Sequence, residues 1–208
     1  MQRLLEGLVK FRRGDFEAHR ELFTELKAEQ KPHTLFITCS DSRVDPNMIT
    51  GTLPGELFII RNIANLVPPY RETLEYVATT SAIEYAVLSL GVENIIVCGH
   101  SNCGGCAACL QPSEFLVTMP HTQKWLELAL PVRDRVLKEI PAADPEARQW
   151  MMEQVNVVEQ LKHLMAYPYI QQQVASGQLT ISGWHYIIET GEVFIYDPNA
   201  REFLLANE

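Results

Sequence analysis

The chain has 208 residues, enough to bury one good-sized core and too few for two fully independent domains. Hydrophobic residues make up 47% and charged residues 21%, which indicates a globular protein and excludes a disordered one. The formal net charge of −9 argues against nucleic acid or an anionic membrane surface as the main partner, so we expect small molecules or other protein chains.

The first ten residues mix Arg3, Glu6 and Lys10 with leucines and lack the apolar core and cleavage site of an export signal. No stretch approaches the roughly 18 to 20 apolar residues that a membrane span needs. We therefore expect a cytoplasmic protein that does not enter a membrane. Its five cysteines, an odd number, favour reduced thiols and metal ligation over a disulfide framework.

The predicted elements alternate between helices and strands. Apolar residues at three- and four-residue intervals predict two helical segments in residues 4–29, broken near Gly14. Short apolar runs predict strands at residues 34–38, 57–60 and 94–98, and helices are predicted at residues 74–90, 122–140, 145–165 and 168–176. The last part of the chain predicts a hairpin of residues 179–188 and 193–196.

This alternation predicts an α/β fold, with a mostly parallel central β-sheet, an antiparallel edge strand and flanking helices. We expect a single domain over residues 1–208, in which residues 1–30 form an N-terminal helical arm and residues 31–208 form the metal-binding core.

Three side chains with soft ligand atoms are placed at the ends of predicted strands. Cys39 closes the first strand, and His100 and Cys103 directly follow the third. Because ligands of such sheets collect beyond the carboxyl ends of the strands, we expect the three to converge there. Two sulfurs and an imidazole make a cage for a divalent metal such as zinc, with a fourth position free for water and catalysis.

Plainer interpretations exist for each cysteine. Cys39 and Cys98 alone are most simply buried strand residues. The spacing of Cys103, Cys106 and Cys109 also fits a thiol redox or sensor protein. Cys106 and Cys109 lie in an alanine-rich, helix-like stretch, which favours packing roles for both.

Asp41 and Arg43 lie just after Cys39, so their side chains are able to pair at the mouth of the site. A solvated surface pair is the ordinary interpretation. Beside a metal, a carboxylate held ionised by an arginine instead orients the attacking group by accepting its hydrogen bond.

Five blocks of sequence resemble the β-class carbonic anhydrases. They are Cys-Ser-Asp-Ser-Arg at 39–43, Arg-Asn-Ile-Ala-Asn-Leu-Val-Pro-Pro-Tyr at 61–70, Ile-Glu-Tyr-Ala-Val at 83–87, Cys-Gly-His-Ser-Asn-Cys-Gly-Gly at 98–105 and Gly-Trp-His-Tyr at 183–186. The resemblance is strongest to bacterial members, including one encoded beside cyanate-degrading enzymes, and to plant-type members. It implies a zinc enzyme that reversibly hydrates carbon dioxide to bicarbonate and a proton, with zinc on Cys39, His100 and Cys103 and with Asp41 and Arg43 as the catalytic pair.

The resemblance also implies a substrate pocket and an assembly. Its pocket residues are Gln30 and the backbone N–H of Gly104, which hydrogen-bond the substrate, and the aromatic walls Phe58 and Tyr76. Related proteins are dimers or larger homo-oligomers with pockets at subunit interfaces. Phe36 stands where a bicarbonate-inhibited subset has tryptophan, so we expect the open type, in which Asp41 pairs with Arg43. Hydrolysis of carbon disulfide or carbonyl sulfide on the same fold is an alternative, and five other histidines are candidates for moving the proton by residue type alone.

Overall fold

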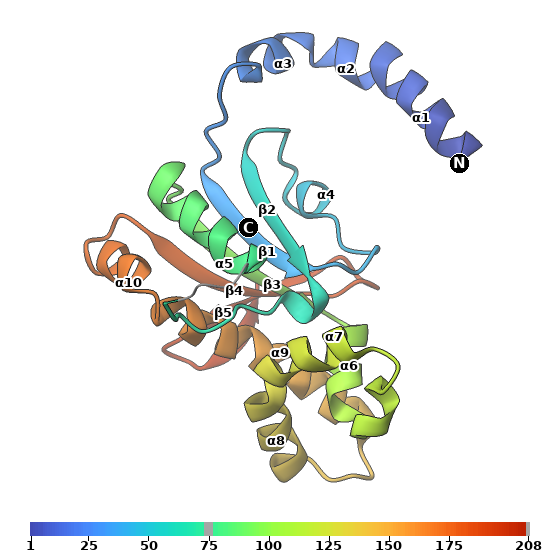
Figure 1. The fold of residues 1–208 in the computed structure, drawn as a ribbon, viewed down its shortest axis with the longest axis vertical. Coiled ribbons are helices and arrows are strands. Elements are labelled where there is room, and N and C mark those ends of the chain that lie inside the picture. The colour runs from blue at the N-terminus through green and yellow to red at the C-terminus, as the bar shows by residue number, and fades with distance from the viewer. Residues whose placement is uncertain (73–76, 207–208) are drawn as a thin grey trace. The chain divides into compact units, whose positions relative to one another are not determined.

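The computed structural model describes residues 1–72 and 77–206 (Figure 1). It separates into two compact units, Met1–Lys31 and Pro32–Glu208. The boundary between them lies one residue from the boundary expected between arm and core. That the two units make up a single domain stays a prediction. Within the described residues, no helix is long and apolar enough to cross a lipid bilayer.

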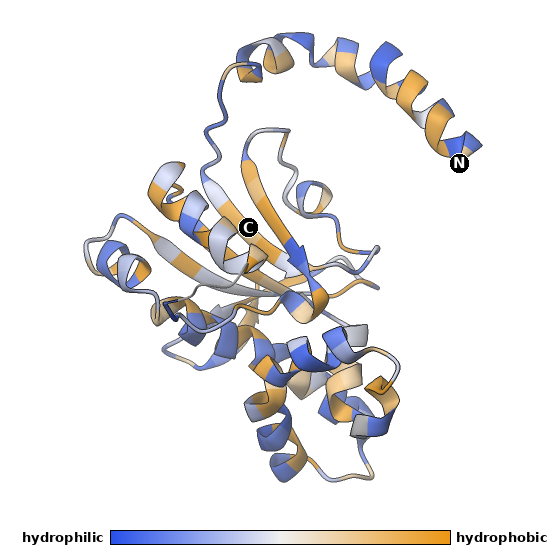
Figure 2. Ribbon diagram, in the orientation of Figure 1, coloured by the Kyte–Doolittle hydropathy of each residue, from blue (hydrophilic) through white to orange (hydrophobic). Residues whose placement is uncertain are grey.

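The first unit consists of three helices, α1 (Gln2–Arg13), α2 (Asp15–Ala18) and α3 (Arg20–Leu26). The predicted break at Gly14 is confirmed, and a second break at His19 was not predicted. Three phenylalanine rings, Phe11, Phe16 and Phe23, pack on one another with centroids 5.1 to 6.1 Å apart. The leucines of α1 nevertheless remain exposed. Figure 2 shows the hydrophobic residues along this helix in orange.

In the second unit, the described residues form one six-stranded sheet of order β2-β1-β3-β4-β5-β6. Its strands are β1 (Thr34–Cys39), β2 (Leu57–Asn62), β3 (Asn94–His100), β4 (Thr180–Tyr186), β5 (Val193–Asp197) and β6 (Glu202–Leu205). The first four are parallel, and β5 and β6 are antiparallel. The mostly parallel α/β fold is confirmed, but the sheet ends in two antiparallel strands, β5 and β6, rather than in one. Residues 202–205 are too few to show an alternating pattern, so β6 escaped prediction.

The helices of this unit include those predicted at residues 122–140, 145–165 and 168–176, and one at residues 46–50 that was not predicted. They are α4 (Pro46–Thr50), α5 (Ala78–Glu84), α6 (Gly104–Leu110), α7 (Pro120–Leu126), α8 (Leu130–Glu139), α9 (Pro145–Met165) and α10 (Pro168–Ala175), with shorter turns η1 (Ile63–Asn65), η2 (Tyr85–Ser89), η3 (Ser113–Leu116) and η4 (Glu127–Ala129). Asp144 caps α9 as expected, because its carboxylate accepts a 2.9 Å hydrogen bond from the Ala147 N–H. The predicted helix at residues 74–90 is described only from Ala78 onward.

The core lies along the central strands. Every residue of β1 is buried, as expected of a parallel strand covered on both faces. Two glycines let α9 pack closely on the sheet. A Cβ at Gly99 of β3 would lie 2.7 Å from Val157 Cγ2, and one at Gly183 of β4 would lie 2.8 Å from Val157 Cγ1. This close packing places the buried face of α9 against the end of β3, where the candidate ligands lie.

Candidate metal centre

Cys39, His100 and Cys103 meet at the carboxyl ends of two neighbouring parallel strands. Cys39 is the last residue of β1, His100 is the last residue of β3, and Cys103 is the N-cap of α6. Their candidate ligand atoms all lie within 4.8 Å of one another, and the two sulfurs are 3.9 Å apart. All three side chains are buried. The structure therefore brings His100 and Cys103 next to Cys39, although they follow it by 61 and 64 positions in the sequence.

The imidazole of His100 is oriented for metal binding. Its Nδ1 lies 2.9 Å from the carbonyl oxygen of Ser101, so Nδ1 carries the hydrogen and donates it there. This leaves Nε2 with a free lone pair, and Nε2 is buried without a hydrogen-bond partner. An orphaned nitrogen that faces two thiols is costly unless a cation lies between them. The donor set of two sulfurs and one imidazole nitrogen fits zinc.

The two thiols hold their protons tightly. The hydrogen bond with Cys103, followed by burial, raises the pKa of the Cys39 thiol to about 12. A hydrogen bond with Cys106 raises the pKa of Cys103 well above its ordinary value. A metal ion that binds these sulfurs must therefore displace their protons.

Asp41 and Arg43 form a bidentate pair beside the cage. Arg43 Nε donates to Asp41 Oδ1 at 2.9 Å, and Arg43 Nη2 donates to Asp41 Oδ2 at 2.8 Å. The Arg43 guanidinium holds the pKa of the Asp41 carboxyl well below its usual range. Asp41 Oδ2 lies 3.9 Å from His100 Nε2, so this ionised carboxylate lies next to the candidate ligands.

Two arginines tie the loop after β1 to its surroundings. Arg43 Nη2 also donates to the backbone carbonyl of Asn102 at 3.0 Å, which joins the loop after β1 to the loop after β3. Arg61 of β2 donates to the carbonyls of Cys39 and Asp41. Arg61 begins one of the sequence blocks of the resemblance, but nothing in its spacing indicates that its side chain hydrogen-bonds backbone carbonyls.

The turn η1 packs against the start of α6 in a strained conformation. Ala64 and Asn65 have φ values of 62° and 48°, which non-glycine residues rarely adopt. A Cβ at Gly105 would lie 2.9 Å from Ala64 Cβ, so only glycine fits there. Gly104, the expected backbone donor, is exposed next to Cys103, with open space where its Cβ would be.

Of the remaining predicted pocket residues, Phe58 lies away from the cage within the second unit. Phe58 pairs with Leu35, four residues before Cys39 on β1, and packs near Tyr85. At 3.3 Å per residue this places Phe58 about 13 Å along the sheet from Cys39. Gln30 is an exposed residue of the first unit, and Tyr76 lies outside the described residues. The substrate roles of all three stay predictions.

The remaining cysteines pack as expected. Cys98, Cys106 and Cys109 are buried, and the last two belong to the apolar cluster around Cys39 and Cys103. Packing roles account for all three.

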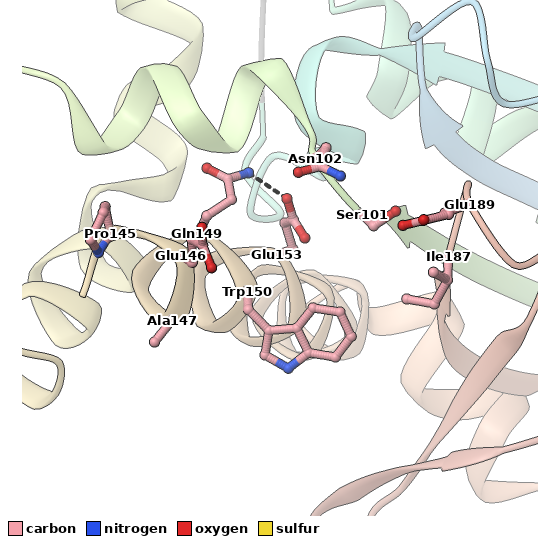
Figure 3. A pocket seen from close by; sticks show the side chains of 10 residues that line it. All are labelled: Ser101, Asn102, Pro145, Glu146, Ala147, Gln149, Trp150, Glu153, Ile187 and Glu189. Atoms are coloured by element: carbon pink, nitrogen blue, oxygen red, sulfur yellow. Dashed lines mark hydrogen bonds between the residues drawn. The ribbon is translucent and has the colours of Figure 1, made fainter.

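Sequence reasoning missed a group of polar residues on α9. Glu153, Asn156 and Gln160 are at most 2% exposed, although their helical spacing is typical of a solvated face. Glu153 also lines a pocket of about 640 Å³, shown in Figure 3, where Gln149 points toward it. Two of the three residues of this polar group, Asn156 and Gln160, are amides, and Glu153 is its one acidic residue. That composition is the one signal in the sequence that separates it from an ordinary solvated face.

Comparisons with known proteins agree with this geometry. A family model described as carbonic anhydrase matches residues 34–193. A carbonic anhydrase of Helicobacter pylori is 41% identical over 95% of this chain and 90% of its own length, and one from Synechocystis is 42% identical over 98% and 74%. The solved β-carbonic anhydrase CcaA has a TM-score of 0.93 at 41% identity and covers 99% of both chains. Tetrameric β-carbonic anhydrases of Sordaria macrospora have a TM-score of 0.83 at 33% identity, with 93% and 95% coverage.

These matches favour carbon dioxide hydration over a thiol redox protein or a hydrolase of sulfur analogues. Their extent, together with the convergence of two cysteines and a histidine at the ends of β1 and β3, identifies this chain as a member of the β-carbonic anhydrase family.

Proposed function

We propose that Cys39, His100 and Cys103 hold the zinc ion with which this enzyme reversibly hydrates carbon dioxide to bicarbonate and a proton. The observation that carries this proposal is the buried, unpartnered Nε2 of His100 facing two sulfurs that lie 3.9 Å apart. Zinc with three protein ligands and one open position supplies a nucleophile near neutral pH by lowering the pKa of water.

Asp41 and Arg43 orient that nucleophile. Because the hydrogen bonds from Arg43 keep Asp41 ionised, its carboxylate accepts a hydrogen bond from the attacking oxygen and turns the lone pair of that oxygen toward carbon dioxide. Two features support the open type of site: Asp41 is paired with Arg43, and residue 36 is phenylalanine rather than tryptophan. The guanidinium also bonds the Asn102 carbonyl, so the pair is tied to both loops that carry the ligands.

The substrate pocket is completed by a second copy of this chain. Phe58 is about 13 Å along the sheet from Cys39, counted at 3.3 Å per residue, so its role as a pocket wall requires another subunit. Gln30, Gly104 and Tyr76 are proposed for the same pocket. Two features support self-association: the exposed apolar face of α1, and the outer side of β2, on which the described residues place no strand. The Sordaria relatives are tetrameric. A cytoplasmic location remains a prediction.

The test compares purified wild-type protein with Cys39→Ala. We expect one zinc ion per wild-type chain and rapid carbon dioxide hydration by stopped flow. Cys39→Ala should lose both the metal and the activity. A wild-type protein that is inactive when fully zinc-loaded would contradict the proposal.

A further inference from the structure

Helix α9 uses polar side chains to grip the backbone of two segments remote in sequence. Toward its C-terminal end, Gln160 Oε1 accepts the Val67 N–H at 2.8 Å, and His163 Nδ1 lies 2.7 Å from the Val67 carbonyl. Between the two ends, Asn156 Nδ2 donates to the Ala64 carbonyl at 2.9 Å. Closer to the N-terminal end of α9, polar side chains hold the backbone of the candidate metal ligand Cys103 in the same way.

Both peptide groups of Cys103 are held by α9. The Cys103 N–H donates to Glu153 Oε1 at 2.9 Å, and Gln149 Nε2 donates to the Cys103 carbonyl at 3.1 Å. Gln149 Nε2 also donates to Glu153 Oε1, so the two side chains brace each other across one helical turn, as Figure 3 shows. A backbone whose N–H and carbonyl are both fixed cannot rotate without breaking one of these bonds.

A carboxylate is an expensive choice at this position. Glu153 is 2% exposed and lies between α9 and the sheet, where an apolar side chain packs at no electrostatic cost. Its second oxygen, Oε2, lies 3.4 Å from Nε2 of the fully buried His185. The carboxylate thus accepts hydrogen bonds from the Cys103 N–H and the Gln149 amide, and its other oxygen faces the His185 ring. A charged acceptor makes a stronger hydrogen bond to an N–H than a neutral one, so it fixes Cys103 more firmly.

We propose that Gln149 and Glu153 are positioning residues that aim the Cys103 sulfur at the site shared with Cys39 and His100. They act through the Cys103 backbone and touch neither the metal nor carbon dioxide. This inference rests on the assignment of zinc to those three ligands. Partners of metal ligands in other proteins typically change metal affinity or activity by about 10- to 100-fold when they are removed.

The experiment compares zinc-loaded full-length Glu153→Ala, Glu153→Gln and Gln149→Ala with a matched control, Asn156→Ala. Asn156 is equally buried on the same helix and also bonds a backbone carbonyl, but that carbonyl belongs to Ala64 rather than to Cys103. The readouts are the rate of zinc transfer to a chelator, the thiolate-to-metal absorption of the cobalt-substituted protein, and kcat and KM measured separately.

We expect Glu153→Ala to lose zinc about 10- to 100-fold faster than wild type, with a shifted cobalt spectrum and a lower kcat at similar KM. Glu153→Gln keeps one acceptor for the Cys103 N–H and should recover most of the loss. Gln149→Ala should fall between wild type and Glu153→Ala. Asn156→Ala should keep zinc within about twofold of wild type, because Asn156 makes no hydrogen bond to Cys103 and instead contacts its neighbour Cys106, at 3.9 Å.

Equal acceleration of zinc loss in Glu153→Ala and Asn156→Ala would overturn the inference, since both residues would then serve the fold alone. Wild-type zinc retention and cobalt spectrum in Glu153→Ala would overturn it as well. If Glu153→Ala does not fold, Glu153→Gln and Gln149→Ala carry the same comparison with Asn156→Ala. A wild-type chain that binds no zinc would refute the proposed function instead, and Cys39→Ala identifies that case independently.

Discussion

Helices α1 and α9 contradict the usual amphipathic rule in opposite ways. In α1 the apolar residues Leu4, Leu5 and Leu8 are 55% to 68% exposed. In α9 the polar residues Glu153, Asn156 and Gln160 are at most 2% exposed. The sequence pattern predicts that each segment is a helix, because both have helical spacing. It does not predict which face is covered, because that depends on what the helix meets.

The two helices meet different kinds of partner. Helix α9 faces irregular backbone, where the Val67 N–H, the Ala64 carbonyl and the Cys103 N–H hydrogen-bond to its side chains. Helix α1 presents an apolar stripe, which a second protein surface is suited to cover. A polar inward face thus indicates loops that are held in place, whereas an exposed apolar face is suited to pack on another protein surface.

The largest effect is expected from removing zinc. Zinc that binds only the folded chain stabilises the loop that the polar face of α9 holds. Chelation should therefore lower the free energy of unfolding by about 4 kcal/mol, the value for a ligand at 1,000 times its dissociation constant. Because the pKa of Cys39 is raised to about 12, its thiol is protonated at neutral pH, so zinc binding releases protons and strengthens as pH rises. Denaturant titration and a pH indicator measure the two effects. Identical denaturation midpoints with and without chelator would mean that zinc does not stabilise the loop held by α9.

Gln160→Leu should have the next largest effect. The substitution leaves the buried Val67 N–H without an acceptor and removes the hydrogen bond to Asn156, so we expect a loss of about 3 kcal/mol. Lys162→Gln on the exposed side of α9 is the control, with an expected change below about 0.5 kcal/mol. Urea denaturation of the zinc-loaded protein measures both. A stable Gln160→Leu protein would mean that the loop at Val67 needs no support from α9.

Gly105→Ala tests whether the loop held by α9 is rigid. The new Cβ would lie 2.9 Å from Ala64 Cβ, and Asn156 holds the Ala64 carbonyl, so η1 cannot easily move away. We expect a loss of about 1 to 2 kcal/mol in the free energy of unfolding. The control is Gly104→Ala, which has open space at the same point of the helix. Equal stabilities of the two variants would show that η1 yields.

The sequence was enough to predict every strand of the described sheet except β6, and the three residues of the ligand cage. The apolar run before Cys39 predicts a buried strand. Because Cys39 ends this strand, it lies beside His100 once β1 and β3 are parallel neighbours. The supporting contacts could not be predicted in the same way. Glu153 is 50 residues from Cys103, and its spacing is equally typical of a solvated helix face. Phe58 shows the remaining limit, because the residue pattern of one chain does not indicate which residues meet in an assembly.

The smallest effect on the stability of the single chain, and the sharpest test of the difference between the helices, is expected from Leu8→Glu. Leu8 is 64% exposed and buries little in its own chain, so the unfolding of the core should change by less than about 0.5 kcal/mol. If the apolar face of α1 packs on another subunit, a buried charge there weakens association, and sedimentation at micromolar concentration should show smaller assemblies. Glu6→Gln, a change of charge alone on the same helix, serves as the control. An unchanged assembly in Leu8→Glu would mean that α1 exposes its leucines for another purpose and that the subunits associate elsewhere, such as along β2.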